Sequence, residues 1–591
     1  MYRLFVFSFL FSCSLSTQDN ERVRSPFIRT ELCLHNQNSD ELSKSVTDDD
    51  SDYIPDDIEN CLGFNPLLQD QDNNNVVDGI DNSYDPFFHK QWHLLSLGTI
   101  VNNSGVPTII GNDLDLIDTY HKYMGYNSSK RIVVQVVDDG VDANHEDLNV
   151  NIAIDLSRDS IDKTMGNPSP RFNEDSHGTM CAGIIAASAF NNIGVRGVAP
   201  FSKIAGSNWL NNQSLKELEE VWLKNDPEGK IAIASNSWGS SDQSVYQDSI
   251  LEEYMRVGTE TLRKYESISR GKIFVKAAGN GRSARANTAL HYDDSNPYVF
   301  SVAALRHDNT YASYSTEGSN LLASAYSGEF HTNSPTIATT TIEGTSATPS
   351  EMTLDKKKGC YTKNNGDYCT KPTWENDHKR NYTYAMNGTS AATPMVAGAL
   401  ALVIEACPFL FWRDVRQLIA KHGKKIDETN PTWITNQAGL HHSTDYGFGL
   451  INTKGMISEC TSEDFTPLPS FTIEEEEFPD LNLFIADYKE VSQTFTISSH
   501  QKIEWIGLTL FSDHTYASDI EIDLVSPQGT KTKLIQGNNS GGSYNMKAGH
   551  RYGSLAFMGE KAEGSWTVII KDKVSRDEGY LKKIQMKIFG H

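Results

Sequence analysis

The chain has 591 residues and a formal net charge of −25 at pH 7. This length is sufficient for two or three domains that each bury their own core. The acidic balance excludes a nucleic-acid-binding function, because a surface that binds phosphates requires clustered Lys and Arg.

Residues 1–17 predict a signal peptide. Arg3 precedes the apolar run LFVFSFLFSCSL, which is too short to span a bilayer. No later stretch is apolar enough to cross a membrane, so we expect a soluble monomer of the secretory pathway, secreted or lumenal. In this oxidising compartment six of the seven remaining cysteines can pair. Six cysteines allow 15 connectivities, and the sequence does not decide among them. Proximity favours Cys360–Cys369, and Cys407–Cys460 and Cys33–Cys61 are the other suggested pairs, with Cys181 left free.

Residues 18–83 form an acidic segment that contains an internal repeat. Oxygen-bearing side chains occupy relative positions 1, 3, 5, 9 and 12 twice: Asp48, Asp50, Asp52, Asp56 and Glu59, then Asp70, Asp72, Asn74, Asp78 and Asp81. This is the spacing of an EF-hand loop, whose oxygens coordinate Ca²⁺. Position 6, which favours glycine, is Tyr53 and Asn75. Without flanking helices, the repeats resemble the calcium-binding loops of thrombospondin-type modules; an acidic disordered spacer is the alternative.

Residues 84–460 alternate short apolar runs with helical segments. Runs such as RIVVQVV, KIAIASNSW and KIFVKAA predict buried strands of a parallel sheet with right-handed crossovers, an α/β domain. Residues 461–470 contain prolines and predict a linker. Residues 471–591 contain strands separated by turns rich in Gly, Ser and Asn, which predict a separate β-sandwich.

Three separated motifs in the α/β domain carry the residues of a catalytic triad. Asp138 follows a buried strand, His177 begins a helix in DSHGTMCAG, and Ser390 begins another in NGTSAATPMVAG. Ser390 is the expected nucleophile, His177 the base, and Asp138 the group that fixes the imidazole tautomer. The backbone N–H of Ser390 and the side-chain amide of Asn280 are the expected oxyanion donors. Each motif alone is as well explained by a helix cap or a turn, but their combination and order favour catalysis.

These motifs resemble the signatures of the subtilases. DDG, DPFFHKQWHL, YGFGLIN and the C-terminal HTYASDIEIDLVSPQGTKTKL are similar to the kexin/furin branch, the proprotein convertases, which end in a P domain. The resemblance implies an α/β subtilisin-like fold with a mostly parallel central sheet, followed by an all-β sandwich. It implies a calcium-dependent serine endopeptidase that cleaves proteins after paired basic residues. The alternatives are a broad-specificity secreted subtilase and an inactive calcium-binding or adhesion protein.

The resemblance also implies an acidic cleft, since a basic side chain taken out of water requires a facing carboxylate. Asp242 and Asp293 match positions that bind the P1 side chain, and Asp139 with Glu174 or Asp175 match those for P2. Asp248, with Glu219 or Glu220, lies near P4, and Ser237 and Trp238 of the NSWG motif line the cleft.

Calcium is implied in the same way. Asp147 and Asn191 match a subtilase calcium site, which Asp85 and the carbonyls of Ala189, Ile193 and Val195 complete. Their oxygens suit Ca²⁺ better than Zn²⁺. Asp242, with Glu317, marks a second site beneath the P1 pocket. Cys181 is expected beside the triad, where a free thiol predicts inhibition by mercurials.

Overall fold

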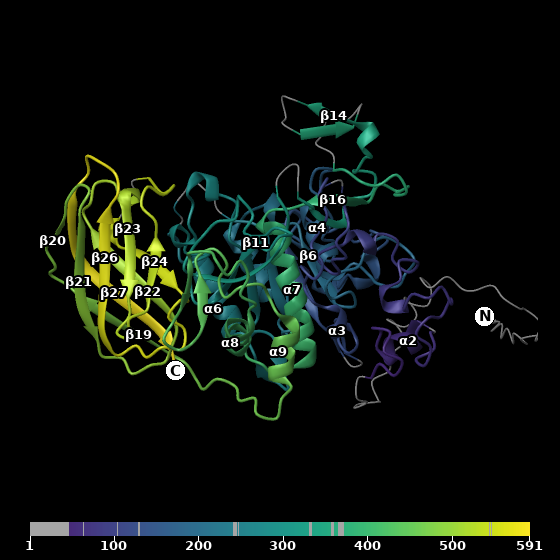
Figure 1. Cartoon of the computed structure of the whole chain (residues 1–591), viewed down its shortest axis with the longest axis horizontal. Coiled ribbons are helices and arrows are strands. Elements are labelled where there is room, and N and C mark those ends of the chain that lie inside the picture. The colour runs from purple at the N-terminus through teal and green to yellow at the C-terminus, as the bar shows by residue number, and fades with distance from the viewer. Residues whose placement is uncertain are drawn as a thin grey trace, which may run out of the picture.

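The computed structural model describes residues 47–591 except 63, 103, 128–129, 240–244, 246, 330–333, 356–359, 364–370, 543 and 545. The predicted signal peptide, Cys33, Asp242 and Cys369 therefore lie outside the described residues. Figure 1 shows the α/β domain in the middle, with the C-terminal β domain on one side and the N-terminal acidic segment on the other.

The α/β domain is built on an eight-stranded sheet with the order β12-β11-β10-β7-β3-β6-β4-β5. All of its neighbouring strands are parallel except β4 and β5. The central strands are buried throughout, as their continuous apolar runs require. The strands are β3 (Val133–Val137), β4 (Arg158–Asp159), β5 (Thr164–Met165), β6 (Lys203–Ser207), β7 (Ile231–Asn236), β10 (Ile273–Ala277), β11 (Val299–Leu305) and β12 (Leu321–Tyr326). The predicted, mostly parallel sheet is confirmed.

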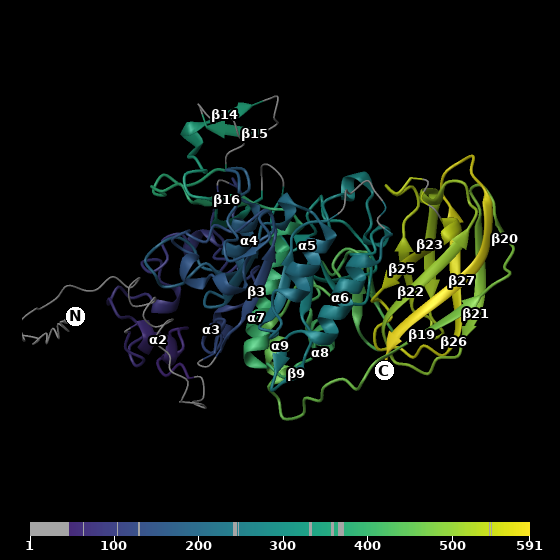
Figure 2. The same cartoon turned by 180° about the vertical axis from the view of Figure 1, so that it is seen from behind.

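Helices cover both faces of this sheet: Figure 1 shows α7, α8 and α9 over one face, and Figure 2 shows α5 and α6 over the other. α7 is long and apolar enough to cross a membrane, but 89% of it is buried inside the protein. The helices are α2 (Asp56–Leu62), α3 (Ile117–Tyr120), α4 (His177–Ala186), α5 (Leu215–Glu219), α6 (Ile250–Thr261), α7 (Thr389–Ala406), α8 (Trp412–His422) and α9 (Thr453–Cys460). Small two-stranded sheets comprise β1 (Tyr126–Asn127) with β2 (Lys130–Arg131), β8 (Lys264–Tyr265) with β9 (Ile268–Ser269), β13 (Ile337–Thr340) with β16 (Tyr382–Met386), β14 (Met352–Asp355) with β15 (Cys360–Lys363), and β17 (Trp433–Thr435) with β18 (His441–Ser443).

The C-terminal domain packs two antiparallel sheets face to face. Buried and partly exposed residues alternate along β23 and β26, so each strand turns one side to the shared core. One sheet holds β19 (Thr472–Phe478), β20 (Leu483–Ile485), β22 (Ile503–Ser512), β25 (His550–Ser554) and β27 (Gly579–Gly590). The other holds β21 (Glu490–Ile497), β23 (Ile520–Val525), β24 (Lys531–Ile535) and β26 (Gly564–Asp572).

A disulfide joins Cys407, just after α7, to Cys460, the last residue of α9. This confirms one predicted pair. Cys181 is buried and free. The other two predicted pairs each include a cysteine outside the described residues.

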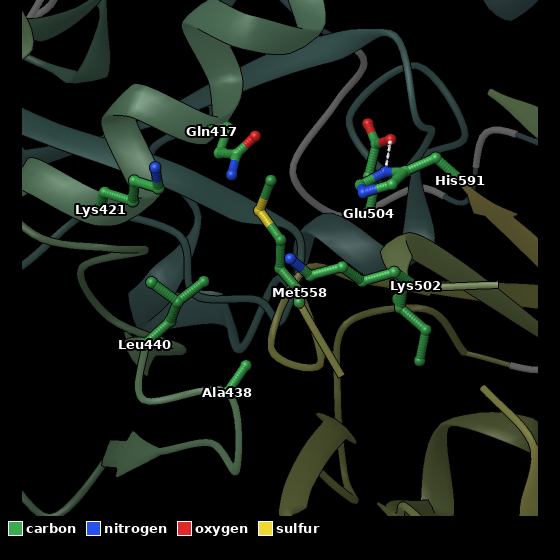
Figure 3. A pocket seen from close by; sticks show the side chains of 10 residues that line it. Gln417, Lys421, Ala438, Leu440, Lys502, Glu504, Met558 and His591 are labelled. Carbon is green, nitrogen blue, oxygen red and sulfur yellow. Dashed lines mark hydrogen bonds and ion pairs between the residues drawn. The ribbon is translucent and has the colours of Figure 1, made fainter. Parts of the chain in front are cut away.

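A buried carboxylate joins the two domains. Glu504 of β22 accepts hydrogen bonds from Arg413 and Arg416 of α8 and, at 2.9 Å, from the ring of His591. Figure 3 shows a pocket between α8 and the C-terminal domain, with Glu504 and His591 in contact on its wall. Burial alone would raise the pKa of Glu504, but the hydrogen bonds and the two guanidinium charges lower it to about 2.

Replacing this carboxylate is expected to destabilise the protein. Glu504→Gln leaves two buried guanidinium groups without a counter-charge, which costs about 3–5 kcal/mol at neutral pH. Because the pKa of Glu504 is lowered from 4.5, its stabilising effect is complete above that value and is lost as the pH falls toward about 2. Urea denaturation of the Ser390→Ala protein from pH 7 to pH 3 measures both effects. Glu474→Gln, which changes an exposed residue of β19, is the control, and equal stability of the two variants would contradict the expectation.

Candidate active site

Asp138 and His177 meet at the carboxyl edge of the central sheet. Asp138 directly follows β3, and His177 is the first residue of α4. His177 Nδ1 donates a hydrogen bond to Asp138 Oδ1 at 2.8 Å. The side chain of Asp138 is 1% exposed and that of His177 is 33% exposed. With Nδ1 bound to the carboxylate, Nε2 is the ring nitrogen that can accept a proton.

Ser390 reaches the same place from the first turn of α7. Its Oγ donates to the carbonyl oxygen of Ser237 at 3.2 Å, and Ser237 Oγ donates to the Ser390 carbonyl oxygen at 3.0 Å. Cys181, one turn after His177 on α4, connects the two helices. Its Sγ lies 4.0 Å from His177 Nδ1 and 3.7 Å from the Ser390 carbonyl oxygen. His177 and Ser390 therefore both lie close to the thiol of Cys181.

Asn280 lies beside the turn that precedes Ser390. Its Oδ1 accepts hydrogen bonds from Thr389 N at 2.9 Å and Thr389 Oγ1 at 3.1 Å. This orientation leaves its amide nitrogen as the atom that can donate to a further acceptor. Gly388 has a φ of +80°, and a Cβ there would lie 3.3 Å from Asn280 Nδ2. A glycine is thus required both by the backbone and by the close approach of the amide.

Burial and charge set the protonation states in the site. Burial alone would lower the pKa of His177, but the charge and hydrogen bond of Asp138 raise it well above its usual value. Burial, followed by the charge of Asp138, raises the pKa of Asp139 to about 7. Burial also raises the pKa of the Cys181 thiol, which keeps it protonated and a poor nucleophile.

The acidic residues near Asp138 and His177 differ in what they contact. Asp139 accepts from the backbone N–H groups of His177 and Gly178 at 3.0 and 2.7 Å, so it binds the N-terminus of α4. Asp175 Oδ2 accepts from Asn211 Nδ2 at 3.0 Å. Glu174 is exposed to solvent.

The second group of predicted cleft residues follows β7. Ser237 contacts Ser390 directly, and the indole N–H of Trp238 donates to the Val137 carbonyl at 2.8 Å, which fixes the NSWG segment against β3. Asp248 is exposed, and its side chain accepts a hydrogen bond from the backbone N–H of Ile250 at the start of α6.

Asp293 is ion-paired inside the protein, which the sequence analysis missed. Lys276 Nζ lies 3.2 Å from Asp293 Oδ2 and 2.8 Å from Asp294 Oδ1, and all three residues are buried. A Cβ on Gly239 would lie 3.1 Å from this ammonium group, so the ion pair lies next to Gly239 of the NSWG motif. The sequence feature that could have indicated this ion pair is Lys276, a lysine within the apolar run KIFVKAA. The role of Asp293 in the P1 pocket stays a prediction.

The predicted calcium residues are brought together only in part. Asp147 accepts from Asn191 Nδ2 at 2.8 Å and from Val195 N at 3.0 Å, in the loop after α4 that also contains Ala189 and Ile193. Burial raises the pKa of Asp147 well above its usual value, and no Lys or Arg among the described residues forms an ion pair with it. Asp147 and Asn191 therefore fit a hard cation.

Two other predicted ligands already have cationic partners. Asp85 is 0% exposed and forms an ion pair with Arg196 at 2.7 Å, so its charge is balanced without a metal. Glu317 lies 3.6 Å from the guanidinium of Arg282. Neither arginine was recognised in the sequence, although Arg196 lies in the otherwise apolar GVRGVAP.

Comparisons with known proteins agree with this geometry. The sequence profile of the subtilase family matches residues 129–449, and that of the proprotein convertase P-domain matches residues 503–588. The crystal structure of a serine protease of Aeromonas sobria superposes with a TM-score of 0.74 at 26% identity, covering 86% of this chain and 96% of that one.

Curated relatives fall into two groups. The extracellular serine protease of Aeromonas sobria is 29% identical over 82% of this chain and 84% of its own length. Human proprotein convertase subtilisin/kexin type 6 is 29% identical over 79% of this chain, and the protease KEX1 of Kluyveromyces lactis is 28% identical over 86%. The alignments span 45% and 61% of these two proteins. The subtilase profile covers more than half of the chain, and the chain therefore belongs to the subtilase family of serine endopeptidases.

Proposed function

We propose that the chain is a secreted or lumenal serine endopeptidase that processes proteins after basic residues, with Ser390 as nucleophile, His177 as general base and Asp138 as its orienting carboxylate. The observation that carries the proposal is the 2.8 Å hydrogen bond between His177 and the buried Asp138, next to the start of α7. The named relatives, which include proprotein convertases, support the substrate class.

The proposed reaction begins when Ser390 Oγ attacks the scissile carbonyl carbon and its proton passes to His177 Nε2. The buried Asp138 stabilises the resulting imidazolium. The negative charge on the carbonyl oxygen is met by the Ser390 N–H at the α7 N-terminus and by the Asn280 amide. His177 then returns the proton to the leaving amine, and water hydrolyses the acyl-enzyme by the reverse proton path.

We also propose a structural Ca²⁺ held by Asp147 and Asn191. Such an ion would balance the charge of the buried Asp147 and fix the loop that follows α4, and it supplies no chemistry to the peptide bond. This loop begins at the end of the helix that carries His177, so fixing it supports the position of the base.

A broad-specificity secreted protease is the second candidate, and one observation favours it. The charge of Asp293 is balanced by Lys276, which weakens the case that this carboxylate binds a basic P1 side chain. The Aeromonas relative, which aligns over most of both chains, is named an extracellular protease. Of the predicted carboxylates that the structure describes, Glu174 and Asp248 are the exposed ones that could bind a basic side chain.

Cleavage of matched peptides separates the two candidates. Peptides that differ only in Lys-Arg, Ala-Arg or Ala-Phe before the scissile bond are compared by kcat/KM, with Ser390→Ala as the inactive control. Processing after basic residues predicts at least about a tenfold preference for Arg over Phe, as expected for a charge paired on binding. Equal rates would support the broad-specificity candidate, and cleavage by the Ser390→Ala protein would contradict both.

Removing the amide donor tests the oxyanion site. Asn280→Ala is expected to reduce kcat by about 10²–10³ with little change in KM, because the donor acts on charge that develops in the transition state. Steady-state kinetics measure the effect, and thermal denaturation controls for the lost contact with Thr389. A variant that keeps kcat within about twofold would exclude Asn280 from the oxyanion site.

The raised pKa of His177 predicts an alkaline activity profile. Only the neutral imidazole can act as a base, and a raised pKa keeps the ring protonated to higher pH. The kcat/KM of the wild type should therefore increase with pH above the ordinary value of 6.5. In Asp138→Asn the pH midpoint of the kcat/KM profile should fall, and the maximal kcat/KM should decrease about 10⁴-fold. An unchanged midpoint in that variant would contradict the assigned pairing.

A further inference from the structure

The first acidic loop of the N-terminal segment, residues 48–59, gathers carboxylates that the active site does not use. Asp48, Asp50 and Asp52 each place a carboxylate oxygen within 4.8 Å of the others. Glu59, on α2, follows at position 12 of the same loop. Figure 1 shows this segment around α2, on the side of the α/β domain away from the C-terminal domain.

Two of these side chains are buried and have carboxylate oxygens without a hydrogen-bond partner. Glu59 and Asp52 are both 0% exposed. Among the described residues, neither oxygen of Glu59 has a hydrogen-bond partner, and one oxygen each of Asp50 and Asp52 lacks one. Ionised carboxylates that are buried and grouped in this way require a positive counter-charge.

The described side chains do not supply enough positive charge to balance these carboxylates. His121 forms a short contact with Asp48 through Nδ1, and the side chain of Asp48 is 3% exposed. An imidazolium there would balance at most one of the charges. Within the described part of the chain, no Lys or Arg forms an ion pair with Asp50, Asp52 or Glu59.

The second loop provides an internal comparison, because it follows the same backbone path. The residues at positions 4 and 6 are left-handed in both loops: Ser51 and Tyr53 with φ of 63° and 78°, Asn73 and Asn75 with φ of 59° and 68°. At position 5, however, the second loop has an amide. Asn74 Nδ2 donates to Asp81 Oδ2 at 2.8 Å, and Ser83 also donates to this carboxylate. The carboxylate at position 12 of the second loop, Asp81, therefore has hydrogen-bond donors nearby, whereas Glu59 at position 12 of the first loop has none among the described residues.

We propose that the first loop binds one Ca²⁺ through the carboxylates of Asp48, Asp50, Asp52 and Glu59. The two unpartnered oxygens of Glu59 suit a bidentate ligand, and the carbonyl of Ile54 occupies the position that supplies a backbone oxygen in such loops. A set of oxygens alone favours Ca²⁺ over a transition metal.

The ion would fix the N-terminal segment on the α/β domain. Ile54, Ile58 and Leu62 belong to the same hydrophobic core as Leu116 and Tyr120. The Tyr53 ring lies 4.5 Å from the ring of His121. Neutralising the carboxylates would remove the repulsion among them and so favour the folded loop that makes these contacts.

Counting bound ions tests the proposal. The whole chain in the Ser390→Ala background is examined by native mass spectrometry after equilibration with CaCl₂, and its Tm is measured in Ca²⁺ and in EGTA. Glu59→Gln is expected to carry about one ion fewer and to gain less Tm from Ca²⁺. Asp49→Asn, which removes an exposed charge from the same loop, is the control and should match the parent. Asp147→Asn reports separately on the ion proposed for the α/β domain.

An unchanged ion count and Ca²⁺-dependent Tm in Glu59→Gln would overturn the proposal, and so would an equal loss in Asp49→Asn. If Glu59→Gln does not fold, Asp50→Asn, at a partly exposed position, takes its place with the same two outcomes.

Discussion

Asp138 is a buried carboxylate, and a buried carboxylate is costly unless a hydrogen-bond donor or an oppositely charged partner stabilises it. Here the partner is His177, delivered by the first turn of α4 to the end of β3. The constraint gives the imidazole one orientation and leaves the opposite ring nitrogen for the proton transfer proposed above. The order of strands and helices in the α/β domain can be understood as the scaffold that holds this pair beside Ser390.

The same constraint recurs throughout the chain. Asp293 and Asp294 are balanced by Lys276, Asp85 by Arg196, and Glu504 by two arginines of α8. Glu504 and its two arginines lie between the domains, so the C-terminal domain supplies the negative charge that balances two buried guanidinium groups of the α/β domain. Glu59 and Asp147 form no ion pair with a Lys or Arg among the described residues, and they are the two buried carboxylates for which cations from solution are proposed.

Much of the fold and site could be predicted from the sequence because the signals are local. Apolar runs identified the parallel strands. Asp138, His177 and Ser390 each lie at an end of a strand or helix, and the combination and order of their motifs could be recognised. Lys276 and Arg196 could not be assigned in this way. Their partners, Asp293 and Asp85, are distant in sequence, and only packing brings the charges together. Tyr53 shows a different limit of prediction from sequence. A tyrosine disfavours a left-handed backbone conformation, yet the loop imposes a φ of 78° on it.

The central claim is that Ser390 is a nucleophile activated by the pair of His177 and Asp138. Labelling with a fluorophosphonate followed by peptide mass mapping tests it most directly, because this reagent reacts with serines that an adjacent base activates. The account predicts one adduct, on Ser390, that is lost in His177→Ala. An adduct on another residue, or equal labelling of Ser390 without His177, would contradict it.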